Sequence, residues 1–574
     1  MVINYYQKSI FPISVRVFLL LAIFVADTVQ AQSSSFPDPT PEIRRQELRQ
    51  EQLRKELESK PSVRLSVQAT HTAQRLPLEP TCFDIKEVVF QGLPALNTKM
   101  AASLPGDGLE DSPIGRCLGV QGIAVLVDRA RNTLIAHGYI TSRIEAPDQD
   151  LSSGRLLLRV IVGRVAMIDK GAGEGWIRHT APVITGETLN LRDIEQSLEN
   201  LRRNPGVQAD IQLRPGEQVD TSDIVLDYSR LRPLRANLTL DDSGSKATGK
   251  LMAQSTLSWD SPLGLSDLAY FSIGRDVGQR QVGPRGNDSQ TLHYSVPWGY
   301  WLMSATLSRS DYRQTIAGPF QSYLYSGQTE SRELQLGRVI HRDTASKTSV
   351  QIKGFSRRSN NFIDDTEVEV QKRLTAGWEA ALQHTRYWGQ VNGDLQLSYR
   401  RGTGAFGAMA APEESFGEGS SRMQVGTAVV NLQWPVADAY RLTAAHHLRM
   451  QVNRTPLVPQ DRMCLGGRHT VRGFDGLQSL CGDRGFLLRN DLILPLNGSI
   501  STYIGLDFGR VSGRSAQDLP EREMAGYVLG LRGHHRMSQG AQIQFEAFAG
   551  GHISKPTFIQ TASTSTGVSL SLNF

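Results

Sequence analysis

Residues 231–574 consist of short segments in which apolar and polar residues alternate, and no helical repeat interrupts them. The clearest of these segments are residues 395–400, 430–434, 542–547 and 568–574. Alternation with a period of two places successive side chains on opposite faces of a β-strand. A soluble β-sandwich shows the same pattern, but the length of this region and its aromatic last residue, Phe574, favour a transmembrane β-barrel. At roughly 20 residues per strand and connection, the region holds about 16 antiparallel strands.

The composition agrees with this mainly β class and excludes one other class. Hydrophobic residues make up 39% of the 574-residue chain and charged residues 21%. Beyond residue 30 no apolar run approaches the ~20 residues of a membrane-spanning helix, which excludes a polytopic helical membrane protein. The 62 Lys and Arg residues are nearly matched by 57 Asp and Glu, so the net charge of +5 gives no reason to expect a nucleic-acid partner.

Residues 1–31 have the features of a cleavable export signal. Lys8 and Arg16 precede an apolar stretch at residues 17–26, and small residues lead up to Ala31 as at a signal-peptidase site. A membrane anchor would need about twice that apolar length. We therefore expect cleavage after Ala31 and export of the mature chain.

Export favours disulfide bonds over metal binding for the four cysteines. Their order in the chain favours two local bridges, Cys82 with Cys117 and Cys464 with Cys481, although four cysteines allow three connectivities. Each of the two bridges would close a short loop and contribute about 3 to 4 kcal/mol.

Residues 32–60 are predicted to contain a polar helix over residues 42–58, with Thr40 as its N-cap and Pro41 in its first turn. Its apolar residues are Ile43, Leu48, Leu53 and Leu57. They form no wide stripe, so we expect a solvated helix without a buried face. Two interpretations follow, a mobile charged tether, which the residues alone favour, and a polar plug in a water-filled lumen. The proline-containing residues 61–80 are predicted to be an extended linker.

Residues 81–230 have the pattern of two small α+β units, each with the order β-α-α-β-β. The first unit, residues 81–163, combines predicted strands at 83–90, 139–144 and 155–162 with a helix at 119–137 that Gly138 ends. The second unit, residues 164–230, combines strands at 164–169, 207–213 and 222–228 with a helix at 191–201.

Short motifs follow one another in order along this mature chain. The first unit contains Cys82-Phe83-x-Ile85, Gly115-x-Cys117-Leu118, His137-Gly138-Tyr139 and Gln149-Asp150-Leu151. The second unit and the first strands contain Leu198-x-x-Leu201-x-x-Asn204-Pro205, Asp241-Asp242-Ser243-Gly244 and Tyr294-Ser295-Val296-Pro297. The most specific motifs are Leu465-Gly466-Gly467-x-x-x-Val471-Arg472-Gly473-Phe474, Gly485-x-x-x-Arg489-Asn490 and Gly505-x-Asp507-x-Gly509. In this order and spacing they resemble the outer-membrane transporters of two-partner secretion, the haemolysin activator and filamentous haemagglutinin transporter family.

The resemblance implies a domain organisation that agrees with the residue patterns. The two small units would be polypeptide-transport-associated (POTRA) domains in the periplasm, preceding a barrel over residues 231–574 in the outer membrane of a Gram-negative cell. The first POTRA domain of the family carries a disulfide, which corresponds to Cys82 and Cys117. The pair Cys464 and Cys481 is not part of the family pattern. The resemblance also favours the plug over the tether for the polar helix.

The resemblance further implies a loop folded back into the lumen. Its tip would be formed by Val471, Arg472, Gly473 and Phe474, with Arg472 paired to Asp507 on the inner wall. The chemistry agrees, because a guanidinium is permanently charged and its fork matches a carboxylate. Gly473 permits a sharp turn, and Phe474 offers a packing anchor. The alternative is an exposed hairpin tip with an unpaired arginine.

The function implied by the family is a pore that recognises a large partner exoprotein and secretes it without ATP, the exoprotein being an adhesin, haemolysin or contact-dependent toxin. Its expected partners are the exoprotein's amino-terminal domain, bound by the POTRA domains, the outer-membrane lipid, and the barrel-assembly machinery that inserts the chain. The alternatives are an outer-membrane insertase of the same superfamily and a passive porin. We expect no nucleic-acid partner, and the two periplasmic units argue against the porin.

No enzyme, metal or cofactor chemistry is expected from the motifs. Residues 244–250 fit most of a phosphate-binding loop, but position 251 is Leu instead of Ser or Thr and a strand follows, so they are predicted to be a hairpin turn. The adjacent pairs His446–His447 and His534–His535 point to opposite faces of a strand and cannot share a metal ion. They are expected in loops or facing the lumen.

Overall fold

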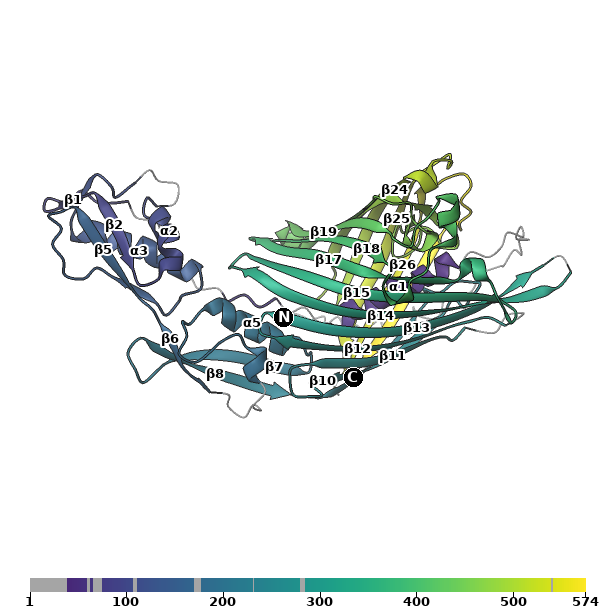
Figure 1. The fold of residues 1–574 in the computed structure, drawn as a ribbon, viewed down its shortest axis with the longest axis horizontal. Coiled ribbons are helices and arrows are strands. Elements are labelled where there is room, and N and C mark those ends of the chain that lie inside the picture. The colour runs from purple at the N-terminus through teal and green to yellow at the C-terminus, as the bar shows by residue number, and fades with distance from the viewer. Residues whose placement is uncertain are drawn as a thin grey trace, which may run out of the picture.

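A computed structural model describes residues 39–58, 62–65, 75–106, 111–169, 177–230, 232–278, 284–318, 320–537 and 540–574. The predicted export signal, residues 1–31, lies outside them. The molecule is elongated, with the first small unit at one end, the second unit beside the barrel mouth, and the barrel at the other end (Figure 1). None of the helices in the described part of the chain is long and apolar enough to cross a membrane.

The alternating region closes into an antiparallel barrel of 16 strands, which confirms the predicted class and strand number. In chain order the strands are β9 (Leu234–Asp241), β10 (Met252–Asp260), β11 (Leu268–Asp276), β12 (Gly286–Trp298), β13 (Trp301–Ala317), β14 (Ser322–Arg342), β15 (Ser346–Ile363), β17 (Arg373–Trp388), β18 (Val391–Thr403), β19 (Gln424–Ala437), β20 (Leu442–Asn453), β23 (Arg484–Pro495), β24 (Ile500–Ser512), β25 (Glu523–Arg536), β26 (Gln542–Ser554) and β27 (Ser565–Asn573). A two-residue strand, β16 (Thr366–Glu367), pairs antiparallel with the last two residues of β15.

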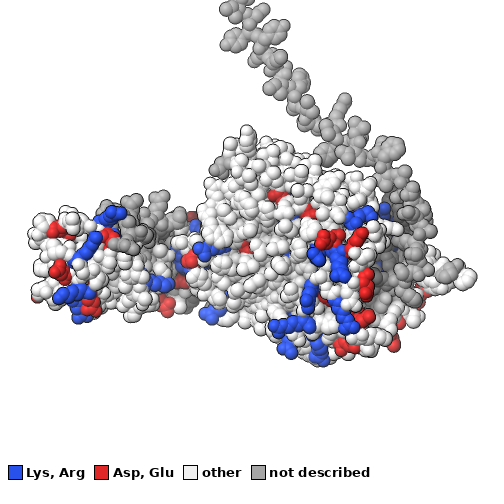
Figure 2. All heavy atoms as spheres, turned by 90° about the horizontal axis from the view of Figure 1, so that it is seen from above, with Lys and Arg blue, Asp and Glu red and all other residues white. Residues whose placement is uncertain are grey.

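The barrel wall is apolar outside and polar inside, the reverse of a soluble domain. On β24 the side chains of Ile504 and Leu506 are exposed, whereas Asp507, the next residue after Leu506, is buried. On β12 Leu292 is exposed and its neighbour His293 is buried. The barrel surface next to the small units carries few charges, which gather instead at the far end of the barrel (Figure 2). This distribution suits a wall that meets lipid outside and water inside.

The barrel is closed by a short ladder between its first and last strands. β27 pairs with β9 over residues 569–573, whereas β13 pairs with β14 along its whole length, residues 301–317. The main-chain N–H of Phe574 also donates to Ala236 O at 2.9 Å. The last residue of the chain therefore takes part in closing the barrel.

The first small unit differs from its prediction in two strands. The stretch predicted as one strand at 83–90 is divided at Lys86 into β1 (Phe83–Ile85) and β2 (Glu87–Gln91). β1 pairs with β3 (Arg116–Leu118), whereas β2 belongs to the sheet β2-β5-β4, so the chain must bend between two sheets. The strand predicted at 139–144 is only β4 (Arg143–Glu145), because Gly138, at φ +92°, and the turn after it end the helix. The other elements of the first small unit are α2 (Pro94–Ser103), α3 (Val120–Ala136) and β5 (Arg155–Ile161).

The second small unit follows its prediction closely. It consists of β6 (Arg164–Asp169), α4 (Ile177–Thr180), α5 (Leu191–Arg202), β7 (Val207–Pro215) and β8 (Thr221–Arg230), with sheet order β6-β8-β7. Asn190 is the N-cap of helix α5, and its side chain accepts a hydrogen bond from the N–H of Arg192. Ile194, Leu198 and Leu201 on its inner face are each about 1% exposed or less and form the core with the sheet.

Of the linker predicted at residues 61–80, the described parts, residues 62–65 and 75–80, contact the two units rather than extending into solvent. At one end Leu76 is buried in the first unit's core, and the carboxylate of Glu79 accepts the N–H groups of Gly119, Gln121 and Gly122 at the start of α3. At the other end Val63 is buried in the second unit's core. A carboxylate at a helix N-terminus satisfies free N–H groups and the helix dipole, so the first unit begins before the predicted residue 81.

The polar N-terminal helix, α1 (Thr40–Leu57), lies inside the barrel (Figure 1). Two details of its prediction are wrong. Thr40 is within the helix and Pro39 precedes it, without a side-chain cap. The helix also buries a face, because Ile43, Leu53 and Leu57 are at most 5% exposed. Leu53 and Leu57 pack on Leu268 and Tyr270 of the wall. The helix is therefore buried through a narrow apolar strip, and its remaining contacts with the barrel are polar.

Candidate functional site

The loop between β20 and β23 enters the barrel as a hairpin. Its two short strands, β21 (Met463–Leu465) and β22 (Leu480–Gly482), pair antiparallel, and the tip with Val471 and Phe474 lies beyond them. Both tip residues are at most 2% exposed and join an apolar cluster with Leu487 of β23, Val511 of β24 and Met524 of β25. Burial of one such side chain stabilises by about 1.5 to 3 kcal/mol. The hairpin is thus packed against the inner wall.

Arg472 is tied to the wall by a fork of hydrogen bonds. Its Nε donates to Asp507 Oδ2 at 2.7 Å, and one terminal nitrogen donates to Asp507 Oδ1 at 2.7 Å. The main-chain N–H of Arg472 donates to Asp507 Oδ2 at 2.9 Å, and the same terminal nitrogen donates to Asp491 Oδ1 at 2.5 Å. Arg472 is 3% exposed and Asp507 is 2% exposed. Bidentate, charge-assisted bonds shielded from water are among the strong hydrogen bonds of proteins.

Gly473 lets the tip approach the wall more closely than any other residue could. It has φ +93°, and a Cβ at this position would lie 2.2 Å from the main-chain oxygen of Gly551 on β26. A Cβ on Gly526 of β25 would in turn lie 1.9 Å from Arg472 O. The main chain of the hairpin tip at Arg472 and Gly473 therefore lies directly against the main chain of β25 and β26. Phe474 O accepts the hydroxyl of Ser565 at 3.1 Å, which adds a contact to β27.

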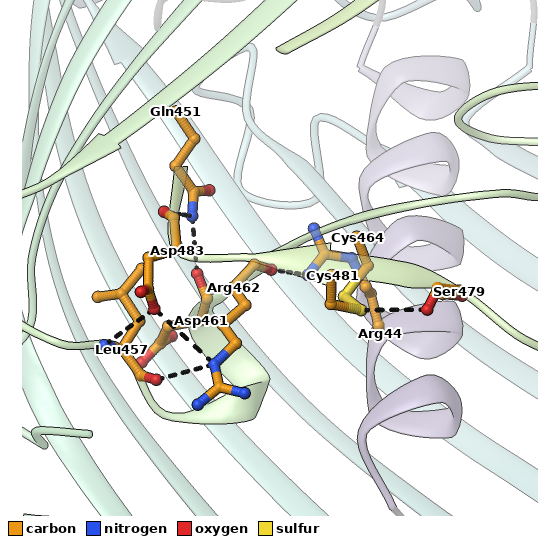
Figure 3. Close-up of a disulfide and its surroundings, with 9 residues drawn as sticks. All are labelled: Arg44, Gln451, Leu457, Asp461, Arg462, Cys464, Ser479, Cys481 and Asp483. Atoms are coloured by element: carbon orange, nitrogen blue, oxygen red, sulfur yellow. Dashed lines mark hydrogen bonds and ion pairs between the residues drawn. A yellow bond between two sulfur atoms is a disulfide. The ribbon is translucent and has the colours of Figure 1, made fainter. Parts of the chain in front are cut away.

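Helix α1 packs against the other side of this hairpin. The side chain of Arg45 donates to Gly476 O at 2.6 Å, and Arg44 donates to Arg462 O. Figure 3 shows Arg44 projecting from the helix toward the hairpin strands that carry the disulfide. The hairpin thus separates α1 from strands β23–β26, and a displacement of either element changes the contacts of the other.

Polar contacts also hold α1 to the opposite wall. Glu47 pairs with Arg357 of β15, Gln46 donates to Asn287 of β12, and His293 Nε2 lies 3.1 Å from Glu58 Oε1. Each of these groups has water as an alternative partner when the helix leaves, so the net free energy of each contact is small.

The four cysteines form two disulfides, Cys82–Cys117 and Cys464–Cys481. The first joins the start of β1 to β3 in the first unit. The second joins directly opposed residues of β21 and β22 at the base of the loop hairpin, inside the barrel. Beside it, Asp461 O and Asp483 O accept the side-chain amide of Gln451, which fixes the hairpin to β20 (Figure 3).

Removing the second disulfide should loosen the loop without releasing it. The bridge spans 17 residues, and a loop of that size corresponds to about 3 kcal/mol of lost unfolded-state freedom. We expect Cys464→Ser with Cys481→Ser to raise protease cleavage within residues 464–481 severalfold and to lower secretion only partly, because Arg472 still holds Asp507. The control is Cys82→Ser with Cys117→Ser, which should leave cleavage within the loop unchanged. Equal loop protection with and without the Cys464–Cys481 bridge would contradict this.

Three polar clusters were missed by sequence reasoning. Asp491 shares the guanidinium of Arg472, and Arg468 of the same loop reaches Asp242 after β9 at 3.0 Å. Arg342 at the end of β14 is 5% exposed and pairs with Glu195 and Glu199 of α5. The sequence did contain a signal for Asp491, because it lies two residues after Arg489 and therefore on the same face of strand β23. No sequence signal connects Arg342 to α5, because 143 residues separate it from Glu199.

In the first unit, Asp111 is a buried anchor for the linker. It accepts the N–H of Leu76 at 2.6 Å and the guanidinium of Arg129 at 2.8 Å. Burial of this carboxyl opposes its ionisation, but these two donors and the charge of Arg116 together hold its pKa below the usual value. The ionised Asp111 therefore fixes Leu76 to the unit at neutral pH.

The motifs considered for other chemistry have structural roles. Residues 244–250 form the turn between β9 and β10, with Gly244 N donating to Lys250 O, which confirms the predicted hairpin. Within the described ranges, no group of three or more His, Cys, Asp or Glu side chains is placed to hold a metal ion. The two histidine pairs lie within strands β20 and β25 rather than in loops.

Comparison with known proteins gives the same assignment as the fold. The family model for the haemolysin secretion/activation protein ShlB/FhaC/HecB matches residues 220–533, a ShlB-type POTRA domain matches residues 83–163, and a POTRA domain matches residues 167–215. The outer membrane transporter CdiB-2 of Burkholderia pseudomallei is 30% identical, with 97% of this chain and 99% of that protein covered. The hemolysin transporter ShlB of Serratia marcescens is 26% identical over 83% of this chain and 82% of that protein.

The same relationship is visible in three dimensions. The solved structure of CdiB from Escherichia coli has a TM-score of 0.82 and 26% identity, with 94% of this chain and all of that chain covered. The barrel and the two POTRA domains define an outer-membrane transporter of two-partner secretion, a pore that secretes a partner exoprotein. The chain belongs to the haemolysin secretion/activation protein family. Its barrel lies in the outer membrane and its POTRA domains lie in the periplasm.

Proposed function

We propose that the transporter rests in a closed state in which α1 is a removable plug and the hairpin tip is a fixed part of the wall. The observation that carries this proposal is the contrast between their contacts. Arg472 at the tip is held by the buried carboxylate of Asp507 and the partly exposed carboxylate of Asp491, whereas α1 is held by a narrow apolar strip and by dispersed polar contacts that water can replace. On the arrival of the exoprotein, α1 leaves the lumen and the tip remains on the wall beside the passing chain.

The POTRA domains bind the exoprotein's amino-terminal domain in this scheme. Each of their sheets has an edge strand that lies beside a helix, β2 beside α2 and β7 beside α5. In the first domain the Asn97 side chain on α2 donates to Phe90 O of β2, and in the second the Arg202 side chain on α5 donates to Ala209 O of β7. An extended segment that adds to such an edge gains main-chain hydrogen bonds with little demand on its sequence.

The energy for export comes from the exoprotein itself. The chain has no intact phosphate loop, and we propose that it catalyses no reaction. Folding of the exported chain outside the cell and its inability to slide back supply the direction. The further partners of this proposal are the outer-membrane lipid around the apolar wall and the barrel-assembly machinery that inserts it. The exoprotein is sought first in the reading frame next to that of the transporter.

Secretion should proceed without nucleotide. We expect proteoliposomes containing the purified transporter to export the unfolded amino-terminal domain of the exoprotein at the same rate with ATP and with apyrase, because the sequence has no intact phosphate-binding loop to couple ATP hydrolysis to movement. Protection of the exported domain from added protease measures the rate. Liposomes with the Arg472→Ala variant serve as the transport-deficient control. Export that stops when apyrase is added would refute the proposed energy source.

A further inference from the structure

Residues 62–65 of the linker lie in a site built by α5 and the mouth of the barrel. The main-chain N–H of Val63 donates to Glu199 Oε1 at 3.1 Å, and the N–H of Leu65 donates to Glu195 Oε1 at 2.8 Å. Arg342 of β14 donates to Val63 O at 2.9 Å. In an extended segment, residues two apart present the same side. The site therefore binds the main chain of an extended peptide through hydrogen bonds with three charged side chains.

The same segment inserts one side chain and rests on an aromatic ring. Val63 is 6% exposed and belongs to the core of the second POTRA domain together with Leu198. Ser62 Oγ lies 2.7 Å from the hydroxyl oxygen of Tyr387 on β17, and the guanidinium of Arg64 stacks 3.6 Å above the Tyr387 ring. Val63 is the one buried apolar side chain of the segment, and Leu65 is partly buried against the same core. The remaining contacts involve the main chain and the ends of polar side chains.

The site is built to persist when the segment leaves. Glu195, Glu199 and Arg342 are at most 7% exposed at their side chains and are paired with one another. Lys347 of β15 adds a second cation at 2.7 Å from Glu199. Burial opposes the ionisation of Glu199, but the Arg342 hydrogen bond and the charges of Lys347 and Arg342 hold its pKa below the usual value. None of these buried charges therefore depends on residues 62–65 for a partner of opposite sign.

A cavity beside the segment gives a second chain access to the site. Its volume is about 310 Å³, and its walls include Ser62, Arg64, Glu199 and Tyr387. The cavity also reaches Asn392 and Asp394 at the start of β18, on the inner side of the barrel mouth. A peptide entering there meets the same carboxylates and the same tyrosine that hold the linker.

We propose that residues 62–65 are the resident occupant of a peptide site, and that its second occupant is an extended segment of the exported chain with an aliphatic side chain in place of Val63. This proposal rests on the proposed function as an exoprotein transporter. The site is distinct from the sheet edges, because its hydrogen-bonding groups are the side chains of α5 and β14.

The site is also connected to the plug. Three residues, 59–61, separate Ser62 from Glu58 at the end of α1, so their Cα atoms are at most about 15 Å apart. Displacement of residues 62–65 thus releases the anchor at the periplasmic end of α1. The exported chain replaces residues 62–65 on the second POTRA domain, and this replacement frees α1 to leave the lumen.

The test uses the full-length transporter and a fluorescent synthetic peptide with the sequence of residues 60–66. In the wild type the tethered segment competes at a high effective concentration, so the free peptide should bind poorly. Val63→Asp expels the tethered segment by placing a charge in the apolar core, and we expect this variant to bind the peptide at least tenfold more tightly than the wild type. A peptide with Asp at the Val63 position should not bind.

The matched control is Val219→Asp, at an 82% exposed position of the same domain, which should behave like the wild type. Val63→Gly, which vacates the pocket without adding charge, should show the same gain as Val63→Asp and guards against misfolding of that variant. The amino-terminal domain of the exoprotein should displace the bound peptide. Equal peptide affinity in the wild type and both Val63 variants would overturn the site, and a domain that does not compete would overturn the second occupant. Peptide binding needs no export, so failure of the transport function alone would leave its result unchanged.

Discussion

Arg472→Ala and Asp507→Ala are each expected to abolish secretion while the barrel remains folded in the outer membrane. The pair is buried, and among the described residues the loss of one partner leaves Asp507 with only Arg489 at 4.0 Å, or Arg472 with only the partly exposed Asp491. Such a loss costs about 3 to 5 kcal/mol, more than the packing of Phe474 alone contributes. The hairpin tip should then detach from β24. The strand ladders of the wall do not depend on this pair, so heat modifiability should be retained.

The double variant Arg472→Ala with Asp507→Ala distinguishes one joint role from two separate roles. Because the residues act as a unit, we expect it to secrete no worse than the worse single variant. The matched control is Arg510→Ala with Glu523→Ala, an exposed pair between β24 and β25 at 3.2 Å, whose loss should leave secretion intact. Secretion is measured as exoprotein in the culture medium. Normal secretion by Arg472→Ala would remove the hairpin from the mechanism.

Deletion of residues 40–57 is expected to raise the ion conductance of the reconstituted pore severalfold. A helix with its side chains fills a cylinder about 10 to 12 Å wide, so its removal opens a water path of that width along the hairpin. Secretion should continue, because the POTRA domains and the pinned tip are unchanged. Conductance of single pores in planar bilayers is the measurement.

Two substitutions within α1 refine this experiment. Arg44→Ala with Arg45→Ala removes the contacts to the hairpin and should increase the frequency of transient openings. Glu51→Ala with Lys55→Ala removes a half-exposed pair within the helix at 2.8 Å and should leave the conductance unchanged. If deletion of the whole helix leaves the conductance at its wild-type level, the helix does not obstruct the pore, and the tether interpretation is correct.

The barrel could be predicted from the sequence because the alternation that defines each strand lies within a few consecutive residues. The alternation of Ile504, Leu506 and Asp507 is visible in the chain itself, and the number of strands follows from the length of the region. Prediction of the site required a family motif in addition to the chemistry of its residues. Arg472 and Asp507 were paired through resemblance to a family, since 35 residues separate them and no local pattern joins them.

The burial of α1 and of the linker could not be predicted for a physical reason. Sequence patterns detect burial through apolar stripes, and α1 is buried mainly by polar partners such as Arg357 and Asn287 on distant strands. Val63 is a single valine in a proline-containing segment. Its burial depends on carboxylates more than 130 residues away, which no periodicity indicates. Similarly, the break at Lys86 reflects pairing with two different sheets and is invisible in a continuous alternation.

The Cys464–Cys481 bridge has a consequence for the order in which the transporter is made. Both sulfur atoms lie within a hairpin that the finished wall surrounds and that α1 covers. An enzyme that oxidises thiols is a folded protein and cannot reach them there. The bond must therefore form while the chain is still in the periplasm, before the first and last strands meet. Cells that lack periplasmic thiol oxidation would insert a transporter whose hairpin has no disulfide, and no thiol-oxidising enzyme supplied later could form it.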